Sequence, residues 1–225
     1  KVKGFIVREV CRNPSNWMSK ETLGEYFLKN NIAAVEGVDT RALTRKIRDR
    51  GTMVGLLTPD NPAEEDISML KSYSFRRPVD QVTSKHAYAI PGKGYRIAVM
   101  DFGVKNNILA CLKQRDCDIT VFPAWTKAEE ILGSNPDAIV LTNGPGDPKD
   151  NTEAVETVKK LGDSKPVFGI CLGHQLLALA SGADTEKLKY GHRGCNHPVK
   201  DLTSGRTYIT SQNHGYTVMD GSIDA

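Results

Sequence analysis

Cys171 stands where the sequence changes from a strand pattern to a helix pattern. It is the central residue of G-I-C-L-G at 169–173, which follows the apolar run PVFG and precedes the helical run HQLLALAS. Small flanking residues permit the sharp backbone turn of a nucleophile elbow, G-x-C-x-G in place of G-x-S-x-G. The helix start behind the sulfur favours the thiolate, and the Leu172 N–H could stabilise an oxyanion. The corner therefore predicts a nucleophile, in preference to an ordinary buried thiol.

Two further segments carry polar groups and glycines at the ends of strand patterns. LTNGPGDP at 141–148 has glycines that permit close approach to a ligand and prolines that stiffen the chain, although Gly-Pro-Gly is also common in plain turns. SQNHGY at 211–216 follows the strand-like TYIT and offers backbone and amide groups for an α-amino and an α-carboxylate group. A polar hairpin loop is the simpler interpretation of the second segment.

These residues need a scaffold, and the pattern from Tyr95 onward supplies one. Apolar strand patterns alternate regularly with amphipathic helix patterns, beginning with RIAVMDFG and ending with the strand and helix around Cys171. The alternation predicts an α/β fold with an open, mainly parallel sheet flanked by helices. Right-handed crossovers place the carboxyl ends of the strands at one edge, where ligands bind in such sheets.

The N-terminal part predicts a smaller mixed α/β domain over residues 1–75. One helix is expected after Ser19, and a second is expected between a cap at Asp39 and Gly51. Residues 52–57 have the pattern of a strand, and Asn61-Pro62 predicts the start of a short helix. Residues 76–94 are polar, with two prolines and two glycines, and are expected to be a linker or extended segment before the domain at 95–225.

Composition excludes several classes of protein. Hydrophobic residues make up 39% of the 225 residues, and 30 basic against 27 acidic residues give a net charge of +3, which predicts a globular protein that binds neither nucleic acid nor membrane. The five cysteines lack CxxC spacing, so reduced thiols are expected, with no metal site. No secretory signal is visible, and we expect a cytoplasmic protein. The abrupt ends suggest a piece of a longer chain.

With these segments in place, the chain resembles the class I glutamine amidotransferases, whose domain is flavodoxin-like. GICLGHQLLALASGA around Cys171 and LTNGPGDP at 141–148 carry this resemblance. KYGHRGCNHPV at 189–199 and TSQNHGYTV at 210–218 are similar, within that class, to the small chains of carbamoyl-phosphate synthases. GVDTRALTRKIRDRGTM at 37–53 resembles the segment that those chains carry ahead of the amidotransferase domain, so the resemblance spans the whole sequence.

The resemblance implies a role for particular residues. Cys171 matches the nucleophile that attacks the glutamine side-chain amide and forms a glutamyl thioester. Leu172 and Gly144 match the positions whose N–H groups form the oxyanion hole. The positions that match glutamine-contacting residues are Gly144, Gly146, Leu172, Gln175, Asn213, Gly215 and Tyr216. Tyr216 stands where the family frequently has Phe, and Cys195 stands where it usually has Gly.

The resemblance also implies partners. Released ammonia is expected to pass through a tunnel to a large synthase subunit, which would use ATP and magnesium to join it to bicarbonate-derived carboxyphosphate for arginine and pyrimidine synthesis. The substrate expected on this chain is L-glutamine, with no cofactor.

The acid/base histidine is a separate question. In the family it comes from a His-Pro-Glu stretch well after the segment that matches 211–216, and His197-Pro198 is followed here by Val199. His174 is expected to pack on the elbow helix, His214 to be structural, and His192 and His197 to be structural or interfacial.

Other functions share these residues. A thiol hydrolase such as a cysteine peptidase also uses a cysteine elbow, other amidotransferases deliver ammonia to different acceptors, and a partner subunit without hydrolytic activity is a third alternative. Turnover of glutamine, cleavage of peptides and co-purification with a large ATP-using subunit distinguish them.

Overall fold

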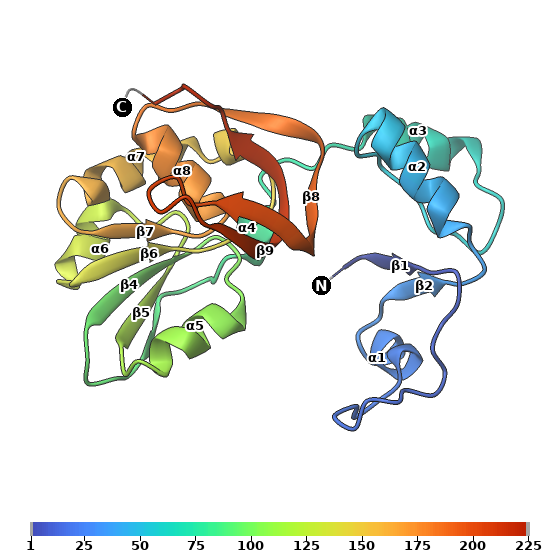
Figure 1. The fold of residues 1–225 in the computed structure, drawn as a ribbon, viewed down its shortest axis with the longest axis horizontal. Helices are drawn as coiled ribbons and strands as arrows, with labels where there is room; N and C mark the ends of the chain where they lie inside the picture. The colour runs from blue at the N-terminus through green and yellow to red at the C-terminus, as the bar shows by residue number, and fades with distance from the viewer. Residues whose placement is uncertain (1, 224–225) are drawn as a thin grey trace. The chain divides into compact units, whose positions relative to one another are not determined.

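The structure is a computed structural model that describes residues 2–223, and the chain divides into two compact units between Ser74 and Phe75. The first unit contains two short strands and three helices: β1 (Gly4–Ile6), α1 (Leu23–Lys29), β2 (Ala33–Val35), α2 (Thr40–Arg50) and α3 (Glu64–Ser72). Strands β1 and β2 pair in parallel. The second unit contains the five-stranded main sheet and a long two-stranded hairpin (Figure 1).

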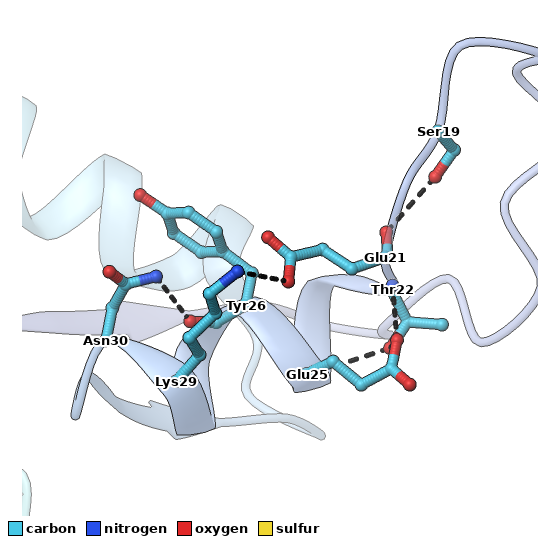
Figure 2. Close-up of polar contacts among 7 residues, drawn as sticks. All are labelled: Ser19, Glu21, Thr22, Glu25, Tyr26, Lys29 and Asn30. Carbon is cyan, nitrogen blue, oxygen red and sulfur yellow. Dashed lines mark hydrogen bonds and ion pairs between the residues drawn. The ribbon is translucent and has the colours of Figure 1, made fainter.

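Helix α1 begins after Ser19, as expected, with a capping box at Thr22. The Thr22 hydroxyl accepts a hydrogen bond from the Glu25 N–H at 3.2 Å, and the Glu25 carboxylate accepts one from the Thr22 N–H at 2.7 Å (Figure 2). This reciprocal pair satisfies two N–H groups that the first turn of a helix leaves without partners. The expected helix is therefore present, with its apolar face anchored by the buried Phe27.

Helices α2 and α3 both form where the sequence predicts them, but only α2 has the predicted N-terminal cap. Helix α2 starts after Asp39, whose carboxylate accepts from the Ala42 N–H at 2.9 Å, and it ends at Gly51, as predicted. Helix α3 starts at Glu64 after an Ala63 cap, so the predicted cap at Asn61 is wrong. The Asp66 carboxylate satisfies the Ala63 N–H instead.

Residues 52–57 do not form the predicted strand. β1 and β2 make up the sheet of this unit, and residues 52–57 run irregularly and pair with no strand of the described chain. A strand is defined by its partner, and a short β-branched run has no reason to stay extended without one.

The segment 76–94 differs from the expected linker. It contains the short helix α4 (Val79–Val82) and the strand β3 (Tyr88–Ile90), which pairs antiparallel with β5 (Asp118–Pro123). The Thr83 hydroxyl accepts from the Ala124 N–H at 2.9 Å, and Val79 is fully buried. Tertiary contacts thus incorporate a segment whose own sequence shows no periodicity.

The main sheet has the strand order β3-β5-β4-β6-β7, in which β5, β4, β6 and β7 are parallel to one another and β3 is antiparallel to β5. The remaining strands and helices of this layer are β4 (Arg96–Asp101), α5 (Asn106–Lys113), α6 (Ala128–Gly133), β6 (Ala138–Leu141), a 3-10 turn η1 (Pro148–Asp150), α7 (Thr152–Gly162), β7 (Val167–Gly169) and α8 (Leu172–Ala180). The predicted open, mainly parallel α/β sheet is confirmed.

Numbered along the chain, the four parallel strands lie in the order 2-1-3-4, which is the order of flavodoxin-like sheets. The order reverses between β4 and β6. The loops that follow these two strands therefore leave in opposite directions and open a crevice at the carboxyl edge of the sheet, where ligands bind in folds of this kind.

Helices cover both faces of this sheet (Figure 1). Along β4, Ala98 and Met100 point into a core shared with α6, α7 and α8. Ile97 and Val99 point the other way, into a smaller core with Leu109 of α5. Successive side chains of a strand alternate between faces, so an unbroken apolar strand is what a sheet buried on both sides requires.

After α8 the chain forms a long antiparallel hairpin. Strand β8 (Thr185–Lys200) pairs with β9 (Thr207–Val218), with irregular register between Lys187 and His192 and between Gly194 and His197. The segment 211–216 thus lies inside a strand rather than in a hairpin loop. Among the helices that the structure describes, none has the length and apolar character needed to cross a membrane.

Candidate active site

Cys171 occupies a backbone conformation that side chains rarely adopt. It lies between β7 and α8 with φ 54° and ψ −109°, and it is partly exposed. A positive φ at a residue other than glycine costs of order 1–3 kcal/mol, and such strain concentrates at functional sites. The predicted elbow is therefore present, with its sulfur at the corner.

The glycines that flank the corner are required by close backbone contacts. A Cβ on Gly173 would lie 2.3 Å from the Leu141 carbonyl oxygen, and a Cβ on Gly169 would lie 2.6 Å from the Gly173 carbonyl carbon. The Gly173 N–H also donates to the Thr142 carbonyl at 3.0 Å. The first turn of α8 thus rests directly on the end of β6, and this contact fixes where the sulfur lies.

The loop after β6 lies beside the elbow, as the sequence predicts. A Cβ on Gly144 would approach the Leu172 side chain to 2.6 Å and the Phe102 carbonyl oxygen to 2.4 Å. Gly146 has φ 94°, which favours glycine. A side chain at either position would push the loop away from Leu172 or distort it, so both glycines keep loop and elbow in contact.

The same loop is tied to the loop after β4 across the reversal in strand order. The Thr142 hydroxyl accepts from the Phe102 N–H at 2.9 Å. The Asn143 side chain accepts from the Lys105 N–H at 3.2 Å and donates to the Gly103 carbonyl at 2.9 Å. These bonds make the two loops at the crevice one connected layer.

Strand β9 brings the third segment to the sulfur. The Cys171 thiol donates to the Asn213 carbonyl, with 3.9 Å between Sγ and the oxygen. Gln175, one turn further along α8 and only 6% exposed, donates from Nε2 to the Tyr216 carbonyl at 2.7 Å. The structure therefore brings together the three segments that the sequence singled out.

Two backbone amides beside the sulfur are free to bind an anion. Within residues 2–223, neither the Leu172 N–H nor the Gly144 N–H makes a hydrogen bond, and the two residues contact each other. Leu172 is the first residue of α8, so its amide also lies at the positive end of the helix dipole. An oxyanion hole needs preorganised donors of this kind.

The residues predicted to contact glutamine differ in how accessible they are. Leu172 and Gln175 are buried, Asn213 is exposed, and the others are partly exposed, namely Gly144, Gly146, Gly215 and Tyr216. The Gln175 amide nitrogen already bonds within the protein. Leu172 can therefore offer its backbone but not its side chain to a ligand.

Tyr216 interacts with the loop of the site through Asp147. Burial raises the pKa of the Tyr216 phenol, and the negative charge of Asp147 and a side-chain hydrogen bond to it raise this pKa further. The contact comes from the phenol oxygen, the one atom by which Tyr differs from Phe. It links β9 to the 141–148 loop.

Asp147→Asn is expected to lower the pKa of Tyr216 towards its ordinary value, because the variant removes the nearby negative charge. Part of the shift should remain, since burial is its largest cause. Asn can still accept the hydrogen bond from the Lys149 N–H that starts η1, so the loop should keep its form. A pH titration of phenolate absorbance, with Tyr216→Phe subtracted, measures the change, and an unshifted titration contradicts the contact.

The histidines do not supply a base at the sulfur. In the part of the chain that the structure covers, no histidine ring forms a hydrogen bond to Cys171. His174 is exposed on α8, so the expectation that it packs is wrong: its neighbours Gly173 and Gln175 take the buried positions of that turn. The His214 ring bonds within the hairpin, in agreement with a structural role.

Sequence reasoning missed Asp101, the last residue of β4. Its carboxylate is 4% exposed and accepts from the N–H groups of Gly103 at 2.9 Å, Val104 at 2.8 Å and Ser84 at 2.8 Å. It therefore shapes the loop that borders the crevice. An acidic residue at the end of a fully apolar strand was the signal in the sequence. Between residues 2 and 223, no three His, Cys, Asp or Glu side chains are grouped to hold a metal ion.

Two families match the sequence. Residues 98–224 match the family described as Glutamine amidotransferase class-I, and residues 1–57 match the family described as Carbamoyl-phosphate synthase small chain, CPSase domain. The first match contains the elbow, the 141–148 loop and the hairpin. The second covers most of the first structural unit.

Curated relatives are similar over almost the whole chain. The carbamoyl phosphate synthase small chain of Clostridium perfringens (strain 13 / Type A) is 52% identical over 219 residues, which are 97% of this chain and 63% of the relative. The carbamoyl phosphate synthase pyrimidine-specific small chain of Bacillus subtilis (strain 168) is also 52% identical over 219 residues, which are 96% of this chain and 60% of that relative. The chain thus spans about three-fifths of the length of these relatives.

Among solved structures, a putative GMP synthase component from Thermoplasma acidophilum superposes with a TM-score of 0.47 at 24% identity. The superposition covers 57% of this chain and 68% of that one.

Proposed function

The chain belongs to the class-I glutamine amidotransferase family, and from this we propose that it is the glutamine-hydrolysing part of a carbamoyl phosphate synthase small chain. One observation carries the proposal: the partly exposed Cys171, at a strained corner with φ 54°, has its sulfur beside the Asn213 carbonyl of β9, and the next residue, Leu172, lies against Gly144 of the 141–148 loop. The neighbouring N-terminal unit matches the small-chain family, which favours this synthase over other amidotransferases.

The reaction begins with attack of the Cys171 thiolate on the side-chain amide carbon of glutamine. The carbonyl electron pair moves onto oxygen, and the free N–H groups of Leu172 and Gly144 stabilise the oxyanion that forms. When the carbon–nitrogen bond breaks, the nitrogen takes a proton and leaves as ammonia, and the carbon remains bound to sulfur as a thioester. Water then attacks the thioester and releases glutamate and the thiol.

Proton transfer requires an acid/base group near the sulfur. We propose that a histidine outside residues 2–223 supplies it, because no described histidine ring bonds to Cys171. His192 and His214 bond to each other on the hairpin, and His174 faces solvent.

Glutamine would lie between the loop and β9. Gly144 and Gly146 would leave room for its α-amino and α-carboxylate groups, while Asn213, Gly215 and Tyr216 of β9 would border it on the other side. Ammonia would then pass to a large subunit that activates bicarbonate with ATP. The activity, the substrate and this partner are proposed for the whole protein rather than for the 225 residues alone.

Release of ammonia from glutamine by the full-length protein, with and without its large partner, tests the proposal. We expect turnover of L-glutamine, little turnover of L-asparagine, and covalent labelling of Cys171 by a glutamine-like diazoketone that excess glutamine prevents. Cleavage of peptides without glutamine turnover would instead identify a thiol peptidase. Absence of both, with retained binding to the large partner, would identify a subunit without hydrolytic activity.

A further inference from the structure

The hairpin carries a set of polar side chains that the proposed reaction does not use. His192 on β8 lies directly opposite His214 on β9, and their rings approach with 3.3 Å between His192 Nδ1 and His214 Nε2. Gln212, on the same side of β9, brings Oε1 to 3.1 Å from the same His214 Nε2. Side chains that face each other across a strand pair stabilise the pair.

The other ring nitrogen of His214 bonds to the segment next to the sulfur. His214 Nδ1 lies 2.8 Å from the Tyr216 carbonyl oxygen, which can only accept, so Nδ1 carries the hydrogen. Gln175 of α8 donates to the same oxygen at 2.7 Å. Two donors, one from the elbow helix and one from the strand, thus hold the Tyr216 carbonyl.

The orientation of the Gln212 amide follows from its neighbours. Thr210 donates its single hydroxyl hydrogen to the His197 carbonyl at 2.9 Å, so its oxygen accepts from Gln212 Nε2 at 3.0 Å. The Gln212 oxygen is therefore the atom that faces His214. Because the Gln212 amide nitrogen donates to Thr210, Gln212 can offer only a hydrogen-bond acceptor to the His214 ring.

His214 Nε2 consequently has a suitable neighbour in either protonation form. A ring with hydrogens on both nitrogens donates from Nε2 to Gln212, and a neutral ring accepts at Nε2 from His192 Nδ1–H. In both forms Nδ1–H remains on the Tyr216 carbonyl. Other charged or titratable groups beside this segment are the Asp147 carboxylate at the Tyr216 phenol, the His197 ring against His192, and the Arg193 guanidinium. Arg193 lies near Gly215 and donates to the Tyr190 carbonyl.

We propose that Gln212 and His192 are positioning residues for the glutamine site. Together they fix the His214 ring, which with Gln175 holds the Tyr216 carbonyl and so sets the position of Asn213–Tyr216 beside the Cys171 sulfur. This inference rests on the proposed function, because it assigns that segment to glutamine binding. The residues touch neither the sulfur nor the substrate, so they act on affinity for glutamine rather than on the chemical step.

The test is the steady-state kinetics of glutamine hydrolysis by the full-length protein with its large partner. In the double variant His192→Leu with Gln212→Met, both polar neighbours of His214 Nε2 are lost. We expect the KM for glutamine to rise by roughly tenfold, which is the change in affinity that the loss of one hydrogen bond causes. We expect kcat to stay within about twofold, because the glycine contacts of the elbow are unchanged.

Two comparisons separate positioning from general damage to the hairpin. His192→Asn keeps a donor close to the position of Nδ1, so this conservative variant should leave KM near that of the wild type. Thr207→Val alters an exposed residue of the same strand and should change nothing. A double variant whose KM stays within about twofold of wild type overturns the inference, as does an equal rise in the conservative variant.

A spectroscopic measurement keeps this inference separate from the proposed function. In protein with ¹⁵N-labelled histidine, the His214 Nδ1 hydrogen should be visible in the wild type and exchange rapidly in the double variant. If the full-length wild type hydrolyses no glutamine, the proposed function fails but the ring can still be examined. An Nδ1 hydrogen that is unchanged in the double variant overturns the positioning role.

Discussion

Cys171→Ser is expected to lower ammonia release from glutamine by roughly 10³-fold or more in the full-length protein with its partner, because a serine hydroxyl at this corner ionises far less readily than a thiol. The side chain keeps its size and its strained position, so the fold should survive. The corner has φ 54°, and its conformation is imposed by contacts of Gly169 and Gly173 rather than by the sulfur. Ammonia release measured with and without the large partner gives the loss, and circular dichroism checks the fold.

The matched control is the same substitution at another thiol. Cys195→Ser changes an exposed cysteine on β8, in the small-chain segment 189–199, and should leave glutamine turnover unaltered. If Cys195→Ser removes activity and Cys171→Ser does not, the nucleophile has been assigned to the wrong residue. A variant at Cys171 that unfolds would show that the side chain supports the structure, which contradicts the argument from the glycines.

Gly173→Ala is expected to reduce the free energy of unfolding by about 3 kcal/mol and to abolish glutamine hydrolysis as well. The added Cβ would lie 2.3 Å from the Leu141 carbonyl oxygen and 2.6 Å from its carbonyl carbon, which are backbone atoms that cannot rotate away. The start of α8 would have to move off β6, and the Gly173 N–H would lose the Thr142 carbonyl. The sulfur and the Leu172 amide move with that turn.

Gly133→Ala provides the comparison, since a Cβ there meets nothing within 4 Å and the residue lies at the end of α6. Alanine should leave stability unchanged or raise it by less than about 1 kcal/mol. Urea unfolding followed by fluorescence measures both variants. If Gly173→Ala unfolds at the wild-type midpoint and keeps its activity, the close contact between helix and strand is not what positions the sulfur.

These two substitutions affect different parts of the site. Cys171→Ser replaces the proposed reacting sulfur and leaves the backbone of the corner unchanged. Gly173→Ala keeps the sulfur but moves the first turn of α8 that positions it. Loss of stability should therefore accompany loss of activity in the second variant only. If both variants are equally unstable, the Cys171 side chain itself supports the fold, which contradicts the separate roles of Cys171 and Gly173.

The predictions that were right are those whose signal is local. The central residues of β4 and all of β6 are apolar, α7 has one apolar face, and the glycine-flanked cysteine requires a sharp turn. The caps at Asp39 and Gly51 likewise satisfy hydrogen bonds within a few residues. In each case the residues that specify the feature are neighbours in sequence.

The predictions that were wrong depend on partners distant in the sequence. Residues 52–57 have the composition of a strand but pair with no described strand, while β3 lies in a polar segment and is a strand because β5 pairs with it. The segment 211–216 is polar yet lies in a ladder with β8. His174 faces solvent because the face of α8 that packs on the sheet lies elsewhere.

Residue types and spacing alone thus specified the sheet, the sharp turn at Cys171 and the polar segments 141–148 and 211–216, since hydrophobic periodicity and the steric demands of a turn depend on adjacent residues. Only the folded chain decided how those segments meet: the first turn of α8 on β6, Gly144 against Leu172, and the Asn213 and Tyr216 carbonyls beside the elbow helix. Contacts between residues distant in the sequence depend on packing and register, to which no single stretch of sequence gives a signal.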